Sequence, residues 1–584
     1  MDLKEIQETP IWGLYQKGLN YQHMIGLVED TDRNYRMYNG DQWNGAKLGG
    51  IEPVQKNFIK PIVKYKVSVI HDNLYGIVYS SQNYENKTFR PQAERYCEML
   101  NGYAMRIWER DQMDFKLRRV TKDAAINDEG IIYVDFDTET MYPVNEVINK
   151  NDIFYGNEND DDIQNQPYIL IRRRMPMVNA LAYAEKSGVS AAKQDMILAD
   201  NNTSEQSGEA AKQEVDDMVT IIFKMYKKDG KVMFSSASRL VDFETDVETG
   251  LSLYPVAHFI WEEKKGSARG EGEVRYLIPN QIEANKVEMR RVLTVKNQAY
   301  PIRVVNRTKV TNPDAVNNCG GTVYTNDNTV DDVSKIISSL PPAQMSNDVK
   351  VLLDDLINIT RELAGAGDVA TGQIDPEQAS GRAILAVSNA SRAPMTEQKE
   401  SCKRFIEDLA RIYLDYLIVY AVEGVNLEEK VTDPVTGEEM IQLVNVPQSA
   451  LEQLKAAVKV DITPKSVYDK FAQEQTLENL LVSGLFNIQR LPELEAWANA
   501  LDDDSVAPKQ KILEIIERMK EEQRKIAMIQ SNAQMMQMRA NNFINEDPDA
   551  QADQMAMASM QVQQEAEGEK ELAKQEAEML QEEK

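Results

Sequence analysis

The residues best suited to act on another molecule are a group of bases in an otherwise acidic chain. Seven bases and one acid, Glu288, lie between positions 286 and 309, so this window carries +6, whereas the 584-residue chain carries −28. The bases are Lys286, Arg290, Arg291, Lys296, Arg303, Arg307 and Lys309. Such bases bind DNA phosphates by releasing counterions, or they pair with acids within and between subunits. The sequence leaves both interpretations of this basic window open.

Other patterns that carry chemistry are missing or lack their structural context. The sequence contains neither the G-x-x-x-x-G-K-[ST] phosphate loop nor the G-x-S-x-G nucleophile elbow. Residues 365–370 match G-x-G-x-x-A, but they follow a predicted helix rather than the strand that a dinucleotide site requires. The three histidines, His23, His71 and His258, are isolated, so no metal-ligand spacing arises. Residues 160–162 are more typical of a solvated acidic loop than of a cation site, so we expect no catalytic residue, metal or cofactor.

Length and composition narrow the class of protein. A chain of 584 residues with 42% hydrophobic and 27% charged residues is expected to fold into several domains. The net charge of −28 argues against a surface that binds nucleic acid or anionic membrane throughout, but it allows one basic zone. Three separated cysteines (Cys97, Cys319 and Cys402) suit a reducing compartment, and neither a signal peptide nor a long apolar run is evident. The sequence predicts a soluble intracellular protein.

A helix is predicted to present the first four bases. Pro279 suits its first turn, and nothing up to Gln298 breaks the helical pattern. Gln281 and Asn285 interrupt the apolar stripe, so we expect this helix to pack on copies of itself or on other polar helices rather than in an apolar core. Beside a copy, the two amides would face the neighbouring subunit. A second helix is predicted over 347–364 after an N-cap at Ser346, with short strands and turns at 301–340 between the two.

The rest of the chain alternates between helical and strand patterns, which predicts an α+β fold that is mostly helical. Residues 1–125 are predicted to be largely helical, with one amphipathic helix over 57–79. Predicted strands occupy 131–137, 168–174, 219–235 and 239–244, with a hairpin turn at 228–230. The later predictions are a long helix from 375 to 424 that kinks at Pro394, a hairpin and a strand within 425–508, a helix of roughly 35 residues from Pro508, and an acidic tail.

Several weak motifs occur in an informative order. Residues 38–43 read Y-N-G-D-Q-W, residues 255–262 form a strand that ends in aromatic residues, and residues 270–285 read G-E-G-E-V-R-Y-L-I-P-N-Q-I-E-A-N. A glycine-rich loop, the sequence A-S-G-R-A-I at 379–384 and a long helix follow. In this combination, over roughly residues 20–530, the chain resembles the portal proteins of tailed bacteriophages.

The resemblance implies that the chain is divided into the parts of a portal subunit. These parts are a wing (1–265), stem helix 1 (266–300), a clip (301–344), stem helix 2 (345–364), a tunnel loop (365–375), a long wing helix (376–424), a wing and crown region (425–507), a crown or barrel helix (508–545) and a tail (546–584). The tunnel loop would contain Gly365, Gly367, Asp368, Thr371, Gly372 and Gln373. Its glycines would let it shift as DNA moves, although Gly365 also suits an ordinary helix C-cap.

The resemblance also implies a function. Twelve portal subunits form a ring at one capsid vertex of the virion, which contacts capsid or scaffold protein, docks the terminase large subunit during packaging, and later joins neck or tail adaptor proteins. Such a protein is made in the host cytoplasm, passes double-stranded DNA without sequence specificity, and is neither an enzyme nor a membrane protein. Restricted basic bands in an acidic ring would attract DNA without holding it tightly. The alternatives are another neck connector or scaffolding protein, and a nucleic-acid-processing enzyme.

Overall fold

A computed structural model describes most of the chain, in two compact units that are treated separately below. The units are Met1–Lys465 and Ser466–Lys584. The described residues are 8–48, 51–71, 73–80, 90–200, 217–299, 303–317, 322–325, 336–340, 345–346, 348–366, 393–432, 439–457, 459–461, 465–466, 494, 497–498 and 509–543. Helices and strands both contribute, which agrees with the α+β class expected from the sequence.

Five helices form the first part of the larger unit. They are α1 (Pro10–Met24), α2 (Leu27–Asn39), α3 (Ile59–His71), α4 (Arg90–Arg110) and α5 (Met113–Ile126). The helix predicted over 57–79 is wrong in its second half, because α3 ends at His71 and is followed by β1 (Asn73–Leu74) and β2 (Val78–Ser80). Tyr79 of β2 pairs with Val460 of β15 (Lys459–Asp461), and its backbone N–H donates to Asn101 at 2.7 Å. This tertiary pairing overrides the local helical pattern.

Two antiparallel sheets follow, and they match the predicted strands. The three-stranded sheet has the order β10-β3-β4, and the five-stranded sheet has the order β5-β6-β7-β8-β9. The strands are β3 (Glu129–Asp137), β4 (Tyr142–Ile148), β5 (Ile153–Tyr155), β6 (Ile169–Pro176), β7 (Met218–Lys228), β8 (Lys231–Ala237), β9 (Asp242–Glu248) and β10 (Val256–Ile260). Asp229 and Gly230, with φ of 52° and 79°, make the tight turn between β7 and β8. Two positive φ values in a two-residue loop match the twist of the strands.

Short helices connect or flank these strands. They are η1 (Lys150–Asp152), η2 (Ile163–Asn165), α6 (Met177–Lys186) and α7 (Ala191–Gln194). Ala180 and Ala184 of α6 are fully buried against the five-stranded sheet, because β6 and β7 contact this helix.

A long helix, α11 (Thr396–Tyr420), covers the three-stranded sheet. Phe405 meets Phe259 of β10 edge to face at 6.1 Å, and the Tyr416 hydroxyl donates to the Val134 carbonyl of β3 at 2.8 Å. Asp415 of α11 accepts from the backbone N–H of Ser252 at 2.8 Å. A 3-10 turn, η5 (Ala393–Met395), precedes α11 at the predicted kink, and residues 376–392 of the predicted helix lie outside the described residues.

Smaller elements complete the larger unit. After α11 come β13 (Val425–Thr432), β14 (Glu439–Val446), α12 (Gln448–Ala457), β15 and β16 (Lys465–Ser466). β13 and β14 form the predicted hairpin, and Arg95 of α4 pairs with Glu429 of β13.

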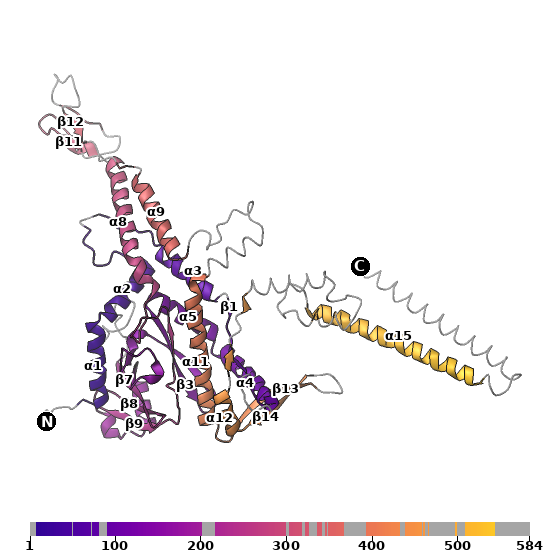
Figure 1. Cartoon of the computed structure of the whole chain (residues 1–584). Helices are drawn as coiled ribbons and strands as arrows, with labels where there is room; N and C mark the ends of the chain where they lie inside the picture. Colours follow the sequence, from indigo (N-terminus) through magenta and orange to yellow (C-terminus); the bar gives the residue numbers. More distant parts are fainter. Residues whose placement is uncertain are drawn as a thin grey trace. The chain divides into compact units, whose positions relative to one another are not determined.

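Two antiparallel helices form the part of this unit that carries the basic window (Figure 1). They are α8 (Glu273–Ala299) and α9 (Asp348–Leu363), and β11 (Arg303–Val305), η3 (Pro313–Asn317) and β12 (Ile337–Ser339) lie between them in sequence. Pro279 is inside α8 rather than in its first turn, so that prediction is wrong. The helix begins earlier because Gly272 packs directly on the Asn127 carbonyl and Glu273 pairs with Lys66 at 2.7 Å. Pro279 is exposed, where a carbonyl without its helical partner can be hydrated.

The second unit contains one long described helix, α15 (Lys509–Phe543), which has 35 residues and matches the helix predicted from Pro508. Ile516 of α15 is buried with Trp497 and Ala498. The acidic tail predicted after this helix lies outside the described residues.

Candidate functional site

The base of α8 is fixed by two buried amides. Gln281 and Asn285 are 0% and 2% exposed. Gln281 accepts from the Phe58 backbone N–H at 3.0 Å and donates to the Lys56 carbonyl at 2.7 Å, while Asn285 accepts from the Lys56 backbone N–H at 3.2 Å. We call these contacts the amide clasp. The expectation that the two amides face a neighbouring subunit is wrong, because the extended segment 51–58 of the same chain already satisfies them.

The amide clasp also joins motifs that are far apart in the sequence. Asn285 donates to the Gln42 side chain at 2.5 Å, and Gln42 donates to the Met37 carbonyl at 3.0 Å. Trp43 next to it donates to the Val54 carbonyl at 3.1 Å. The Y-N-G-D-Q-W motif therefore contacts the motif at 270–285 in the N-terminal half of α8.

The basic window is partly neutralised within the chain. Lys286 pairs with Glu283 at 2.7 Å, and Arg291 lies 3.6 Å from Glu288, which Lys56 also approaches at 3.2 Å. Lys296 pairs with Glu52 in segment 51–58, and this interaction lowers the pKa of the Glu52 carboxyl. These pairs join α8 to itself and to segment 51–58, so part of the window has a structural role.

The remaining bases of the window differ in their surroundings. Arg303 donates to the Val316 carbonyl, whereas Arg290 and Arg307 are exposed and show no ion pair among the described residues. Lys309 is half-buried and is not without an interaction partner. The structure thus brings four of the bases together along α8, and among its described residues Arg290 and Arg307 are exposed bases without an ion pair.

A second polar cluster lies near α11, where a buried carboxylate contacts an arginine and a histidine. Glu129 of β3 is fully buried, accepts a hydrogen bond from Arg269, and lies 2.6 Å from His258 Nε2. Arg269 also contacts Glu158 at 3.0 Å. Burial raises the pKa of the Glu129 carboxyl, but the combined effect of Arg269, His258 and Lys150 is larger and lowers this pKa to about 2. The cluster therefore holds a stable carboxylate between two sheet layers.

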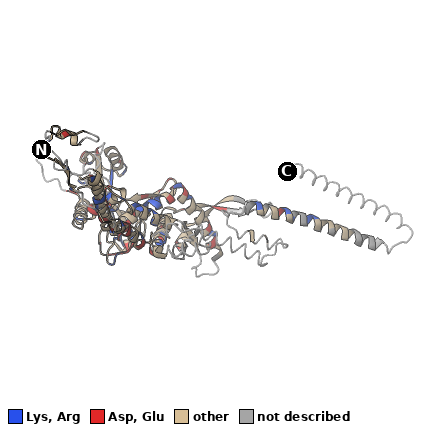
Figure 2. Cartoon of the chain, turned by 90° about the horizontal axis from the view of Figure 1, so that it is seen from above, with Lys and Arg blue, Asp and Glu red and all other residues tan. Residues whose placement is uncertain are grey.

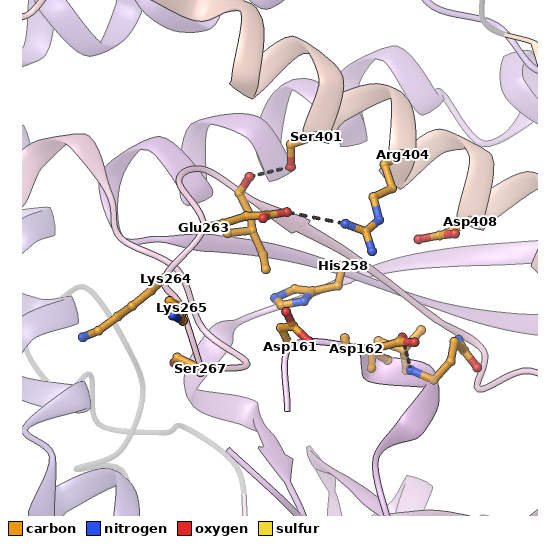
Figure 3. Close-up of a pocket in the computed structure, with 14 residues that line it drawn as sticks. Asp161, Asp162, His258, Glu263, Lys264, Lys265, Ser267, Ser401, Arg404 and Asp408 are labelled. Carbon is orange, nitrogen blue, oxygen red and sulfur yellow. Dashed lines mark hydrogen bonds and ion pairs between the residues drawn. The ribbon is translucent and has the colours of Figure 1, made fainter. Parts of the chain in front are cut away.

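A cavity of about 410 Å³ opens beside this cluster (Figure 3). Arg404 of α11 points into it and lies 3.4 Å from Glu263, with His258 and Asp161 on the facing side. Among the described residues no group of three acids, histidines or cysteines is placed to hold a metal ion. Asp162 instead accepts from the Gln164 backbone N–H at 2.8 Å, as an acidic loop residue that caps a turn. The residues that line the cavity carry both charges, and the Ser401 hydroxyl among them donates to the Ile260 carbonyl at 2.6 Å rather than to a base.

A comparison with known protein families distinguishes between the candidate functions that the sequence left open. Residues 192–582 match the family of phage P22-like portal proteins, which is more than half of the chain. The chain belongs to this portal family. No curated protein matches it. The match includes α8, α9, α11 and α15 of the portal protein, and none of its described helices is long and apolar enough to cross a membrane.

The residues predicted to form a tunnel loop are described only at their start, at 365–366. Gly365, with φ of 69°, ends α9, and its N–H donates to the Glu362 carbonyl at 2.9 Å, so it serves as a helix C-cap. The other predicted loop residues, Gly367, Asp368, Thr371, Gly372 and Gln373, lie outside the described residues.

Proposed function

We propose that this portal protein forms a dodecameric ring at one capsid vertex and conducts double-stranded DNA during terminase-driven packaging and ejection. The supporting observation is the antiparallel α8–α9 pair inside the family match, interrupted by a small β excursion. In the proposed subunit α8 and α9 form the stem, residues 301–344 form the clip, and residues 365–375 form the tunnel loop. α8 has 27 residues, which gives a stem of about 40 Å at 1.5 Å per residue.

The remaining ranges are assigned to the wing and the crown. The wing comprises residues 1–265 and the long helix 376–424, and the crown comprises 425–507 and the helix at 508–545, followed by the tail at 546–584. The proposed ring docks terminase during packaging, contacts capsid or scaffold protein, and then binds neck or tail adaptor proteins. It uses no cofactor and has no enzymatic activity of its own.

Charge supports a conduit rather than a tight DNA-binding protein. The chain carries −28, and Figure 2 shows Lys and Arg interspersed with Asp and Glu along the described residues. Tight binding requires many neutralised phosphates, whereas the ion pairs of Lys286, Arg291 and Lys296 occupy most of the α8 bases. Arg290 and Arg307 remain as exposed charges that attract the duplex weakly. DNA can then slide without sequence recognition.

Electron microscopy with native mass spectrometry tests this proposal. Purified full-length chain should give rings with a central hole, and the assembly mass should correspond to twelve copies of the 66.3 kDa subunit. Rods or monomers at all concentrations would refute the ring and favour another connector or scaffolding protein. ATP turnover or DNA cleavage by the isolated chain would instead refute the absence of enzymatic activity.

A further inference from the structure

α9 carries two apolar rows, and α8 of the same chain covers only one of them. The inner row is Leu353, Ile357, Thr360 and Ala364, in which Leu353 and Thr360 are 0% and 2% exposed. The outer row is Leu352, Leu356, Ile359 and Leu363, each of which directly precedes one member of the inner row in the sequence. Leu352, Ile359 and Leu363 are 57%, 53% and 81% exposed. Both rows advance by four, three and four residues, which is the spacing of a helix–helix seam.

An exposed seam of this kind indicates a missing partner helix. A surface helix of a globular protein has one apolar stripe, and a second stripe beside it is expected where a second helix packs. Large apolar side chains at three of four seam positions lose contact with water when such a helix covers them. The outer row therefore marks an interface rather than scattered surface residues.

Charge identifies which helix of a second copy fits. α9 contains four acids and two bases, so two α9 helices would repel each other. The part of α8 from Glu283 to Ala299 contains four bases and two acids, so it attracts α9. The charges favour an α8–α9 contact between copies.

α8 offers a matching row on the side away from its own α9. Asn280 faces α9, because its side chain donates to Thr360 at 3.0 Å. Ile282 lies two residues further on, about 200° around the helix, and begins a row with the same four-three-four spacing. This row is Ile282, Lys286, Met289 and Leu293, of which Ile282 is 36% exposed. Three of its four members are apolar, as a seam requires.

We propose that the outer row of α9 packs on the Ile282–Lys286–Met289–Leu293 row of α8 in a second copy of this chain. The inference rests on the proposed ring, whose copies lie at one height. Counting along the antiparallel helices from the Asn280–Thr360 contact then places Ile359 close to the level of Ile282, and Lys286 level with the acids Asp354 and Asp355. Lys286 thus belongs to subunit assembly, not to the DNA path.

Photocrosslinking in mixed rings tests the contact directly. A benzophenone amino acid at Ile359 is introduced into isotopically light full-length chain, which is then assembled with heavy chain. Light–heavy crosslinks should map to residues 275–299, and the same probe at Lys350, on the other flank of α9, should give few of them. Rings that crosslink only within one chain, or to another region, would overturn this inference and leave the ring intact. An absence of rings in the unmodified chain would instead refute the proposed function.

A matched pair of substitutions gives an independent readout. Leu352→Asp should reduce the ring fraction in sedimentation at least tenfold, because a carboxylate would be buried in the seam. Val351→Asp alters a neighbour that is equally exposed, at 56%, but lies outside both rows, and it should leave assembly unchanged. Helicity measured by circular dichroism should be the same in both variants. Equal assembly of the two variants would contradict the proposed seam.

Discussion

The amide clasp predicts that one side chain of α8 stabilises a segment more than 200 residues away in sequence. Gln281→Met keeps the size and the helix propensity but removes the acceptor of the Phe58 N–H and the donor to the Lys56 carbonyl. A buried polar group left without a partner costs about 1 to 3 kcal/mol. With two backbone groups affected, the local opening free energy should fall by about 2 to 6 kcal/mol. The substitution should therefore release segment 51–58 without unfolding α8.

Hydrogen exchange measured by mass spectrometry checks this prediction at the affected amides. A loss of 2 kcal/mol or more corresponds to exchange about 30-fold faster, since about 1.4 kcal/mol is a factor of ten. The peptide that contains Lys56 and Phe58 should show this acceleration. Gln298→Met is the matched control, because Gln298 is exposed on the same helix. If the two variants exchange alike at Phe58, the clasp does not hold the segment and the reasoning is wrong.

Three further predictions concern stability, each measured by urea denaturation of the full-length chain. Glu129 has a folded pKa of about 2 against an ordinary 4.5, so the stability it contributes is complete above about pH 4.5 and is lost as pH falls toward 2. Glu129→Gln should flatten this dependence. It also breaks the buried Glu129–Arg269 pair and leaves Arg269 with Glu158 alone, so it should destabilise the protein by about 3 to 5 kcal/mol at neutral pH. Burial lowers the pKa of His71 from 6.5 to about 4, so the free energy of unfolding should also fall as pH drops from 6.5 to 4. His71→Phe should remove this part of the pH dependence. If the variant and the original chain show the same pH dependence, the prediction for His71 is wrong. Leu353→Ala, at a fully buried position between α8 and α9, should lower the free energy of unfolding by about 2 to 5 kcal/mol. Leu363 is 81% exposed, so Leu363→Ala should change the free energy of unfolding of the monomer by less than about 0.5 kcal/mol. Equal effects of the two substitutions would contradict the assignment of the inner and outer rows.

The elements that depend on local periodicity could be predicted from the sequence. Alternating β-branched and aromatic residues gave the strands at 131–137 and 219–235, and the turn at Asp229-Gly230 required only the conformational freedom of its residues. The α8–α9 pair followed from helical spacing and from the Ser346 cap. These signals are contained within a few turns or one hairpin.

Contacts between distant segments could not be predicted in the same way. Tyr79 stood in a helical pattern but joins β15, which lies almost 400 residues later. Gln281 and Asn285 interrupted an apolar stripe, and nothing in their spacing showed that backbone amides of segment 51–58 would meet them. The pairing of Glu129 with Arg269 had a single weak signal, an acid directly before a buried strand. In each case the partner is fixed by tertiary packing, which a periodicity does not encode.

The amide clasp limits the motions open to α8. Because Gln281 and Asn285 bond to the backbone of segment 51–58 from one side of α8, rolling the helix about its axis by one residue, about 100°, would break every one of these bonds. Tilting α8 together with segment 51–58 and α3 breaks none of them. Of these two motions, the hydrogen bonds of the amide clasp oppose a roll of α8 and are preserved by a tilt that segment 51–58 shares, so the clasp couples the inclination of α8 to that of this segment.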